Sequence, residues 1–187
     1  VTRMSREALP PAFVLTEMMM SLWVPQALHA AAELGVADAI DPGGARPSDE
    51  IADVVGAHRG AVYRLLRALT VIGVCEEMED RRFRLTALGD CLRAEGRDTV
   101  RSWARLMGNP GIWGAWGRLA DCVRTGEHAW KLEGTDAFAW LQQNPDVGAI
   151  FNQAMFEVSR RTARAVAEAY DFSRVRTIVD VGGGYGT

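Results

Sequence analysis

The first long hydrophobic stretch of the chain is apolar almost all round rather than on one face. Residues 11–34 carry few charges, and Pro25 falls near their middle. Because proline removes a helical hydrogen bond and clashes with the preceding turn, the pattern predicts two helical pieces, joined or kinked at Pro25 and ended at Gly35. A helix without a polar face must be covered on most sides. Since a domain this small rarely covers such a helix alone, we predict that residues 13–32 lie in an intertwined homodimer interface.

From residue 47 the hydrophobic spacing changes to that of short amphipathic helices. Pro47 and the acids after it suit a first helical turn, and Gly56 suits its end. A second helix is predicted from residue 58 to a stop at Gly73. A β-hairpin follows, with strands near 74–78 and 83–86 and a turn at 79–82. This order of helix, turn, helix and hairpin is the winged-helix arrangement. The predicted buried positions of the two helices are Ile51, Val54, Val55, Val62, Leu65, Leu66, Leu69 and Ile72.

The rest of the chain is predicted to be helical until shortly before its last strand. Glycines divide residues 87–145 into short helices, and Thr135 is a plausible N-cap. Pro145 begins the longest helix, which ends near Tyr170 and has one apolar face. The positions predicted to lie off that face are Asp146, Glu157, Arg160, Arg161, Arg164 and Glu168. Residues 177–181 (TIVDV) then predict a buried strand.

The composition is that of a globular protein without an obvious charged partner. The net charge is −3, from 21 basic and 24 acidic residues, which recruits neither nucleic acid nor an anionic membrane. Residues 18–32 carry no formal charge but fall short of the roughly 20 residues that a membrane span needs. The three cysteines lie far apart, without zinc-type spacing, so we expect no metal and no disulfide. Free thiols indicate a reducing, cytoplasmic location.

The last residues carry the most informative motif. Asp180 follows the predicted strand, and glycines at 182, 184 and 186 complete the spacing D-x-G-x-G-x-G. Glycine permits positive φ and lets backbone N–H groups come close to a ligand. The third glycine comes one residue earlier than in the dinucleotide motif G-x-G-x-x-G, which favours a methyl-donor site. A glycine-rich hairpin is the alternative without a ligand.

Four segments carry a resemblance to a known family. VDVGGGYGT resembles the first S-adenosylmethionine-binding motif of class I small-molecule O-methyltransferases, and FNQAMFEVSRRTARAVAEAYDF resembles the helix before it. ALHAAAELGVADAI and GAHRGAVYRLLRAL resemble the winged-helix dimerisation domain of that family. The similarity is closest to bacterial enzymes that methylate phenolic or polyketide hydroxyls. It implies a mainly α winged-helix dimerisation domain (1–100), a helical linker with pocket helices (101–172) and the first strand of an α/β Rossmann-like domain (173–187).

The resemblance also implies roles for individual residues. The positions that match the cofactor site are Asp180, Gly182, Gly184, Gly186 and Ser159. The positions that match the acceptor pocket are Phe151, Met155 and Val158. Val158 departs from the histidine of plant members, so acceptor contacts there would be apolar. Core packing is the alternative for Phe151 and Met155. The implied reaction transfers a methyl group to a hydroxyl of a small aromatic or polyketide-type metabolite.

Two other functions remain open on the sequence. Arginines in the second predicted helix and in the hairpin (Arg59, Arg64, Arg67, Arg81, Arg82 and Arg84) could make a DNA-binding surface. Four acids in the same hairpin oppose this, because phosphate binding needs an uncompensated basic face. The other alternative is a truncated, non-catalytic dimerisation fragment. We expect the catalytic base beyond Thr187, so that these 187 residues are inactive alone.

Overall fold

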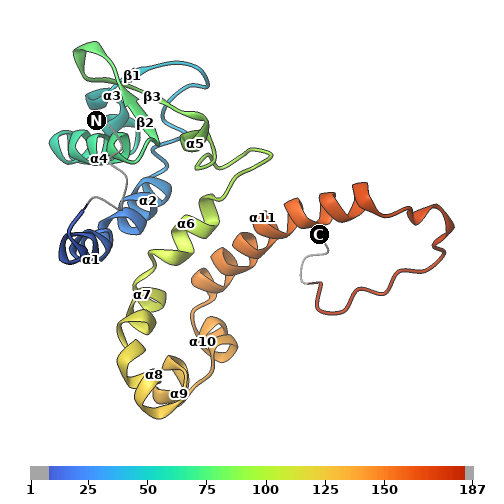
Figure 1. The fold of residues 1–187 in the computed structure, drawn as a ribbon. Coiled ribbons are helices and arrows are strands. Elements are labelled where there is room, and N and C mark those ends of the chain that lie inside the picture. Colours follow the sequence, from blue (N-terminus) through green and yellow to red (C-terminus); the bar gives the residue numbers. More distant parts are fainter. Residues whose placement is uncertain (1–8, 184–187) are drawn as a thin grey trace.

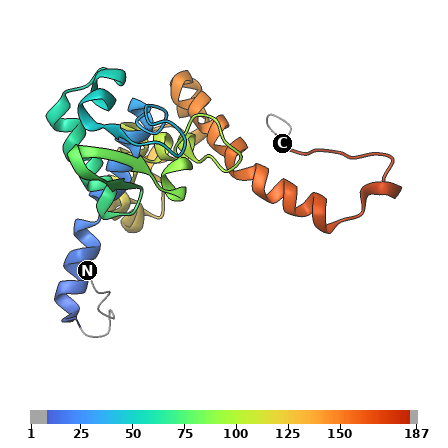
Figure 2. The same cartoon turned by 90° about the horizontal axis from the view of Figure 1, so that it is seen from above.

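Residues 9–183 are described by the computed structural model, and they form a mainly helical molecule with one small sheet (Figure 1). The N-terminal helices and the sheet gather at one end of the molecule. The later helices extend from it as an arm that turns back through α10 and α11 (Figure 1), and the view from above shows α11 extending away from the N-terminal unit (Figure 2). The first helices are α1 (Pro11–Met20), α2 (Trp23–Leu34), α3 (Ser48–Val54), α4 (Arg59–Val71) and α5 (Ala87–Asp90). The later helices are α6 (Arg101–Met107), α7 (Pro110–Gly117), α8 (Leu119–Thr125), α9 (Ala129–Leu132), α10 (Ala137–Gln143) and α11 (Pro145–Ala169).

The break between the first two helices lies at Ser21 and Leu22, so the predicted joint at Pro25 is wrong. Ser21 ends α1, and its hydroxyl donates to the Met18 carbonyl at 2.6 Å. Pro25 is the third residue of α2, where a backbone N–H has no helical acceptor and its absence costs little. The predicted end at Gly35 is confirmed, because this residue caps α2 with φ of 72°.

The predicted helix, turn, helix and hairpin are confirmed. Strands β2 (Cys75–Glu77) and β3 (Arg82–Leu85) pair antiparallel, and the short β1 (Arg46–Pro47) adds to the other side of β3. The 3₁₀ turn η2 (Glu79–Arg81) joins the two hairpin strands. On α3 the predicted burial of Ile51 is confirmed, but Val54 is 62% exposed, contrary to the prediction, and the other buried apolar residue is Ala52. The winged-helix unit is therefore formed as expected, apart from the exposure of Val54.

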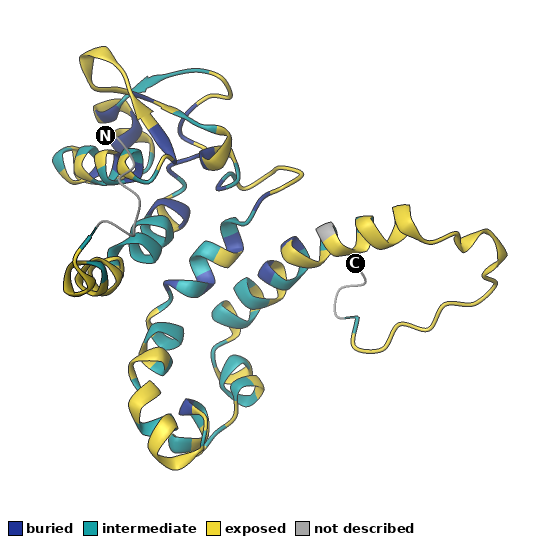
Figure 3. Ribbon diagram, viewed as in Figure 1, coloured by how far each residue is buried: buried dark blue, intermediate teal, exposed yellow. Residues whose placement is uncertain are grey.

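The hydrophobic core lies within this unit (Figure 3). Phe83 of β3 is fully buried, and its ring meets the Tyr63 ring of α4 edge-on at 6.0 Å between centroids. Fully burying a large side chain contributes roughly 1.5–3 kcal/mol. The other large side chains at its centre are Ile40, Ile51, Leu66 and Leu69.

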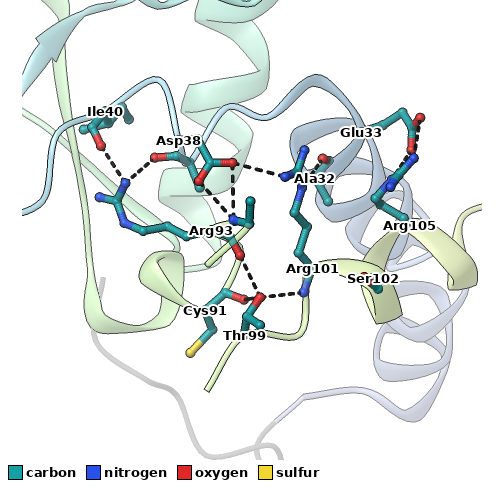
Figure 4. A network of polar contacts seen from close by, with 12 residues as sticks. Ala32, Glu33, Asp38, Ile40, Cys91, Arg93, Thr99, Arg101, Ser102 and Arg105 are labelled. Carbon is teal, nitrogen blue, oxygen red and sulfur yellow. Dashed lines mark hydrogen bonds and ion pairs between the residues drawn. The ribbon is translucent and has the colours of Figure 1, made fainter. Parts of the chain in front are cut away.

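Ion pairs and backbone contacts tie α6 to the end of α2 (Figure 4). The Arg101 guanidinium donates to the Ala32 carbonyl at 3.0 Å and lies 3.3 Å from Asp38. One turn later, Arg105 pairs with Glu33 at 2.7 Å, and this hydrogen bond lowers the pKa of Glu33. Because α6 also packs along α11, it connects the winged-helix unit to the longest helix.

The long helix begins and ends as predicted, but the segments around it differ from expectation. The N-cap of α10 is Asp136 rather than Thr135, since its Oδ1 accepts from the amides of Phe138 and Ala139 at 2.9 Å. Beyond α11, the 3₁₀ turn η3 (Phe172–Arg174) leads into an extended segment that returns toward α11 (Figures 1 and 2).

The predicted strand at 177–181 is wrong for this structure. Residues 175–180 have no regular secondary structure, and Ile178 and Val179 are 72% and 79% exposed. A parallel strand needs a neighbour to take up its backbone groups. Among residues 9–183 no other strand lies beside this segment, because the single sheet observed there belongs to the winged-helix unit. The Rossmann-like part of the expected fold is therefore not seen here as a sheet.

Candidate functional site

A groove of about 720 Å³ lies between the middle of α11 and the glycine-rich turn. It brings together six of the eight residues for which the sequence suggested a binding role: Phe151, Met155, Val158, Ser159, Asp180 and Gly182. Gly184 and Gly186 lie outside the described residues. The groove residues that the sequence reasoning missed are Phe138, Asn152, Phe156, Thr162, Ala163 and Gly183.

Helical spacing explains why α11 offers this set. Residues spaced three or four positions apart lie on the same face of a helix. This spacing places positions 151, 155, 158, 159 and 162 on one face of α11. On the adjoining face, Ala154 and Glu157 are 0% and 5% exposed and are turned toward α6. The sequence pattern predicted that Glu157 lies on the polar face of the helix. This prediction is wrong, because Glu157 is buried. Val158 and Ser159 are exposed and line the groove. One face of α11 therefore packs against α6, and the adjoining face lines the groove.

The turn after residue 180 depends on glycine at two positions. Gly182 has φ of 77°, a conformation that residues with a side chain rarely adopt. A Cβ on Gly183 would lie 1.6 Å from Oδ2 of Asp180. The Asp180 carboxylate therefore folds over the backbone of Gly183, at the edge of the groove. A carboxylate held there can accept hydrogen bonds from a ligand hydroxyl or ammonium group.

An apolar chamber of about 450 Å³ adjoins the groove, and Phe151 and Met155 line both spaces. Three tryptophans form much of its wall: Trp103 of α6, Trp116 of α7 and Trp130 of α9. Trp130 also packs against Trp140, with ring centroids 6.0 Å apart. Five of the six tryptophans lie between residues 103 and 140, and that concentration was the available signal for an aromatic pocket. Its chemistry suits a flat, mostly apolar molecule.

The groove, which adjoins the apolar chamber, is lined by polar side chains. Asn152, Ser159, Thr162 and Asp180 supply amide, hydroxyl and carboxylate groups. Within residues 9–183, no group of three or more histidine, cysteine, aspartate or glutamate side chains is placed to hold a metal ion. The same part of the chain contains no helix with the length and apolarity needed to cross a membrane.

Several basic side chains of the winged-helix unit have partners within the protein. Arg59 pairs with Asp53 at 2.7 Å, and their hydrogen bond lowers the pKa of Asp53. In the hairpin, Arg84 pairs with Glu76 at 2.5 Å, and the Arg81 guanidinium lies 4.8 Å from the Tyr63 ring centroid. These contacts compensate much of the charge that a phosphate backbone would need.

Two family models match the chain, one over its N-terminal half and the other over its C-terminal part. The O-methyltransferase dimerisation domain matches residues 16–95, and the O-methyltransferase domain matches residues 116–187. The first match covers α2 to α5 with the sheet, and the second covers the end of α7, α11 and the glycine-rich turn. Both binding spaces therefore include residues of the second match.

Individual relatives agree with these matches. The chain is 37% identical over 180 residues to a phenazine O-methyltransferase of Lysobacter antibioticus, covering 96% of this chain and 52% of that one. It is also 37% identical over 179 residues to an aclacinomycin 10-hydroxylase of Streptomyces purpurascens, covering 92% of this chain and 47% of that one. The chain thus spans about half the length of these curated relatives.

One solved structure adds bound molecules to the comparison. It is the O-methyltransferase of neocarzinostatin biosynthesis, in complex with S-adenosyl-L-homocysteine and 1,4-dihydroxy-2-naphthoic acid. The fold is similar with a TM-score of 0.69 at 32% sequence identity, covering 91% of this chain and 52% of that one.

Proposed function

We infer that this chain belongs to the family of O-methyltransferases that pair a dimerisation domain with a methyltransferase domain, because both family models match it in that order. We propose that it serves, as part of a longer enzyme, to transfer a methyl group from S-adenosylmethionine to a hydroxyl of a small aromatic or polyketide-type metabolite. The observation that carries this proposal is the junction of two spaces at Phe151 and Met155. On one side lies a groove with polar groups and a glycine-rich turn, and on the other lies an apolar chamber lined by tryptophan.

The groove is proposed as the cofactor side of the site. Asp180 and Gly182, with Gly184 and Gly186 of the same motif, would hold the methionine and ribose part of S-adenosylmethionine, and Ser159 would lie near the donor. The fit is supported by the turn itself, because Gly182 has positive φ and a Cβ at Gly183 would displace the Asp180 carboxylate. When bound, S-adenosylmethionine supplies an electrophilic methyl group.

The chamber is proposed as the acceptor side. Phe151 and Met155, which line both spaces, would contact the acceptor together with Val158 at the adjoining groove, with tryptophan side chains around the acceptor rings. Apolar walls exclude water and hold the acceptor in one orientation, which lowers the entropic part of the barrier. We assign no catalytic base among residues 9–183. The contribution of these residues to the reaction is therefore proximity and orientation.

The domain division that accompanies this function is a dimerisation domain at 1–100, pocket helices at 101–172 and the start of the cofactor-binding part at 173–187. We propose a homodimer, supported by the matched dimerisation domain and by the exposed apolar side chains of α1. A cytoplasmic location is supported by the three free cysteines, because free thiols are typical of a reducing compartment. Burial raises the pKa of the Cys75 thiol to about 12. We propose no nucleic acid or membrane partner, since arginines of the winged-helix unit have acidic partners.

The acceptor side is tested by tryptophan fluorescence. We expect 1,4-dihydroxy-2-naphthoic acid to quench the emission of this chain with saturation, because Trp103, Trp116 and Trp130 line the chamber. Met155→Asp should weaken this binding by about tenfold or more, since an unpaired carboxylate would be buried against the acceptor. Val123→Asp is the matched control, because Val123 is 77% exposed on α8 and lines neither space. Equal affinity for both variants would contradict the proposed acceptor side.

The reaction itself needs a separate measurement, because one relative carries the name of a hydroxylase. Protein that carries the complete methyltransferase domain should convert a dihydroxynaphthoate to its methyl ether when S-adenosylmethionine is present. Mass spectrometry distinguishes a gain of a methyl group from a gain of an oxygen atom. A product with added oxygen and no methyl group would replace methyl transfer by hydroxylation.

A further inference from the structure

The most deeply buried carboxylate in the described chain lies on α11, next to the proposed binding face. Glu157 is 5% exposed, and its Oε2 accepts a hydrogen bond from the backbone amide of Ser102 at 3.0 Å. A buried carboxylate without a partner would be costly, so this contact explains why the side chain is tolerated between two helices. Nothing in the helical pattern distinguished Glu157 from the charged residues that face solvent.

The amide that Glu157 binds belongs to the first turn of α6. The N-cap of α6 is Val100, which offers no side-chain acceptor to this turn. Thr99 Oγ1 accepts from the Arg101 amide at 3.2 Å, and Glu157 serves the next amide along. The side chain of one helix therefore caps the first turn of another, a task usually done by the N-cap residue.

A second contact holds the last turn of α6 to α2. Arg105, on the next turn, pairs with Glu33 of α2 at 2.7 Å. The pKa of Arg105 is raised mainly by its hydrogen bond to Glu33, and the charge of Glu157 raises it further. The Glu157 carboxylate therefore lies near a guanidinium that is itself anchored to Glu33 of α2.

The consequence concerns the rotation of α11 about its own axis. Ala154 and Glu157 are three residues apart and are buried together, and the small Ala154 side chain allows close packing on that face. Met155, Val158 and Ser159 follow these residues by one or two positions and line the groove. Since each residue turns the helix by about 100°, holding Glu157 in place fixes the direction of these three side chains.

We propose that Glu157 is a positioning residue, whose hydrogen bond to the Ser102 amide sets the rotation of α11 and with it the shape of the acceptor and donor contacts. The bond itself is independent of what the groove binds. The effect on ligand affinity rests on the function proposed above.

A series of substitutions separates bond geometry from charge. Glu157→Gln keeps both the length and an acceptor oxygen, whereas Glu157→Asp keeps the charge but is one methylene shorter. Glu157→Ala removes both the acceptor and the charge. Leu69→Ala is the control for stability, because Leu69 lies in the winged-helix core away from α11. Each variant is titrated with 1,4-dihydroxy-2-naphthoic acid by tryptophan fluorescence, and thermal midpoints are measured in parallel.

We expect Glu157→Gln to retain affinity within about twofold, and Glu157→Asp and Glu157→Ala to lose about fivefold and tenfold or more, because a lost buried bond is costly. Leu69→Ala should lose stability but not affinity. If Glu157→Asp binds better than Glu157→Gln, charge rather than geometry decides and the proposal fails. Equal losses in Leu69→Ala would reduce Glu157 to a general stabilising residue and would also overturn it.

Hydrogen exchange tests the bond without any ligand. The Ser102 amide should exchange slowly in the parent chain and in Glu157→Gln, and faster in Glu157→Asp and Glu157→Ala. Unchanged protection in Glu157→Ala would overturn the proposal. If the parent chain protects the Ser102 amide but does not bind the naphthoic acid, the proposed acceptor site fails while the capping contact stands.

Discussion

At the scale of single residues, the turn after Asp180 combines two demands that only glycine meets together. Gly182 adopts φ of 77°, and Gly183 leaves room for the Asp180 carboxylate over its backbone. The first demand concerns the path of the chain, and the second concerns the space above it. A substitution at 183 therefore disturbs the position of the carboxylate rather than the fold, since the atom it meets is the end of a side chain that can move.

This separation predicts the behaviour of Gly183→Ala. A Cβ placed 1.6 Å from Oδ2 should expel the Asp180 carboxylate from its position. In protein that carries the complete methyltransferase domain, we expect the affinity for S-adenosylmethionine to fall by about tenfold, the effect of one charged hydrogen bond. Calorimetry measures this change, and the thermal midpoint should stay unchanged. Gly117→Ala, on open helix surface, is the control, and unaltered binding by Gly183→Ala would show that the carboxylate is not needed there.

At the scale of elements, the short helix α6 determines how the molecule is joined. It has only seven residues and no side-chain N-cap of its own, so isolated helix propensity would not maintain it. Glu33 and Ala32 of α2 hold it from one side, and Glu157 of α11 holds it from the other (Figure 4 shows the contacts to α2). The stability of this junction should therefore respond to the ionisation of Glu33, whose pKa is lowered by its hydrogen bond with Arg105.

The pair of Glu33 with Arg105 gives a pH dependence with a defined sign. The hydrogen bond from Arg105 lowers the pKa of Glu33 in the folded state below that in the unfolded chain, which is about 4.3. Its stabilisation is therefore complete above that unfolded value and is lost as the pH falls through the lowered folded value. Because both side chains are partly exposed, the contribution is at most about 1 kcal/mol and should weaken with salt.

The measurement compares the thermal midpoint of the parent chain and Glu33→Gln between about pH 6 and pH 3. We expect the parent to be more stable at pH 6 and the difference to shrink as acid is added. Glu79→Gln serves as the control, because Glu79 has no ion-pair partner within the described residues. A difference that grows toward pH 3 would contradict the assigned sign.

At the scale of the whole molecule, α1 presents a run of exposed apolar side chains on the N-terminal unit. No residue of this helix is buried, and Leu15, Met19 and Met20 are 59%, 59% and 65% exposed. A monomer in water rarely leaves a helix of this kind uncovered. The match of residues 16–95 to a dimerisation domain agrees with a second copy as the cover.

We therefore expect light scattering to give twice the mass of the 20.5 kDa chain at micromolar concentration. Met19→Glu should shift the protein toward monomer, because the charge would be buried in an interface that typically exceeds about 2,000 Å². Val123→Glu should leave the mass unchanged, although Val123 is more exposed than Met19. A parent chain that stays at 20.5 kDa would defeat the dimer.

The sequence by itself determined those features that depend only on residues close together in the chain. The end of α2 at Gly35, the hairpin around residues 79–82 and the start of α11 at Pro145 were all predicted, because caps, turns and helix starts act through local backbone geometry. The glycine motif and the helix before it likewise indicated a resemblance to O-methyltransferases, and the O-methyltransferase domain model matches residues 116–187. These signals extend over a few residues and do not depend on how the chain folds back.

Only the tertiary structure decided the features that depend on distant partners. Residues 177–181 carry a strand pattern but form none here, because a strand needs a neighbour that a pattern does not supply. Glu157 read as a surface acid, yet the Ser102 amide, 55 residues earlier, turns it into a buried contact. The tryptophan chamber likewise exists because α6, α7 and α9 meet α11 in space. Whether a polar group is buried, and whether aromatic side chains form a pocket wall, depends on packing between elements that are distant in the sequence. The local sequence pattern does not determine that packing.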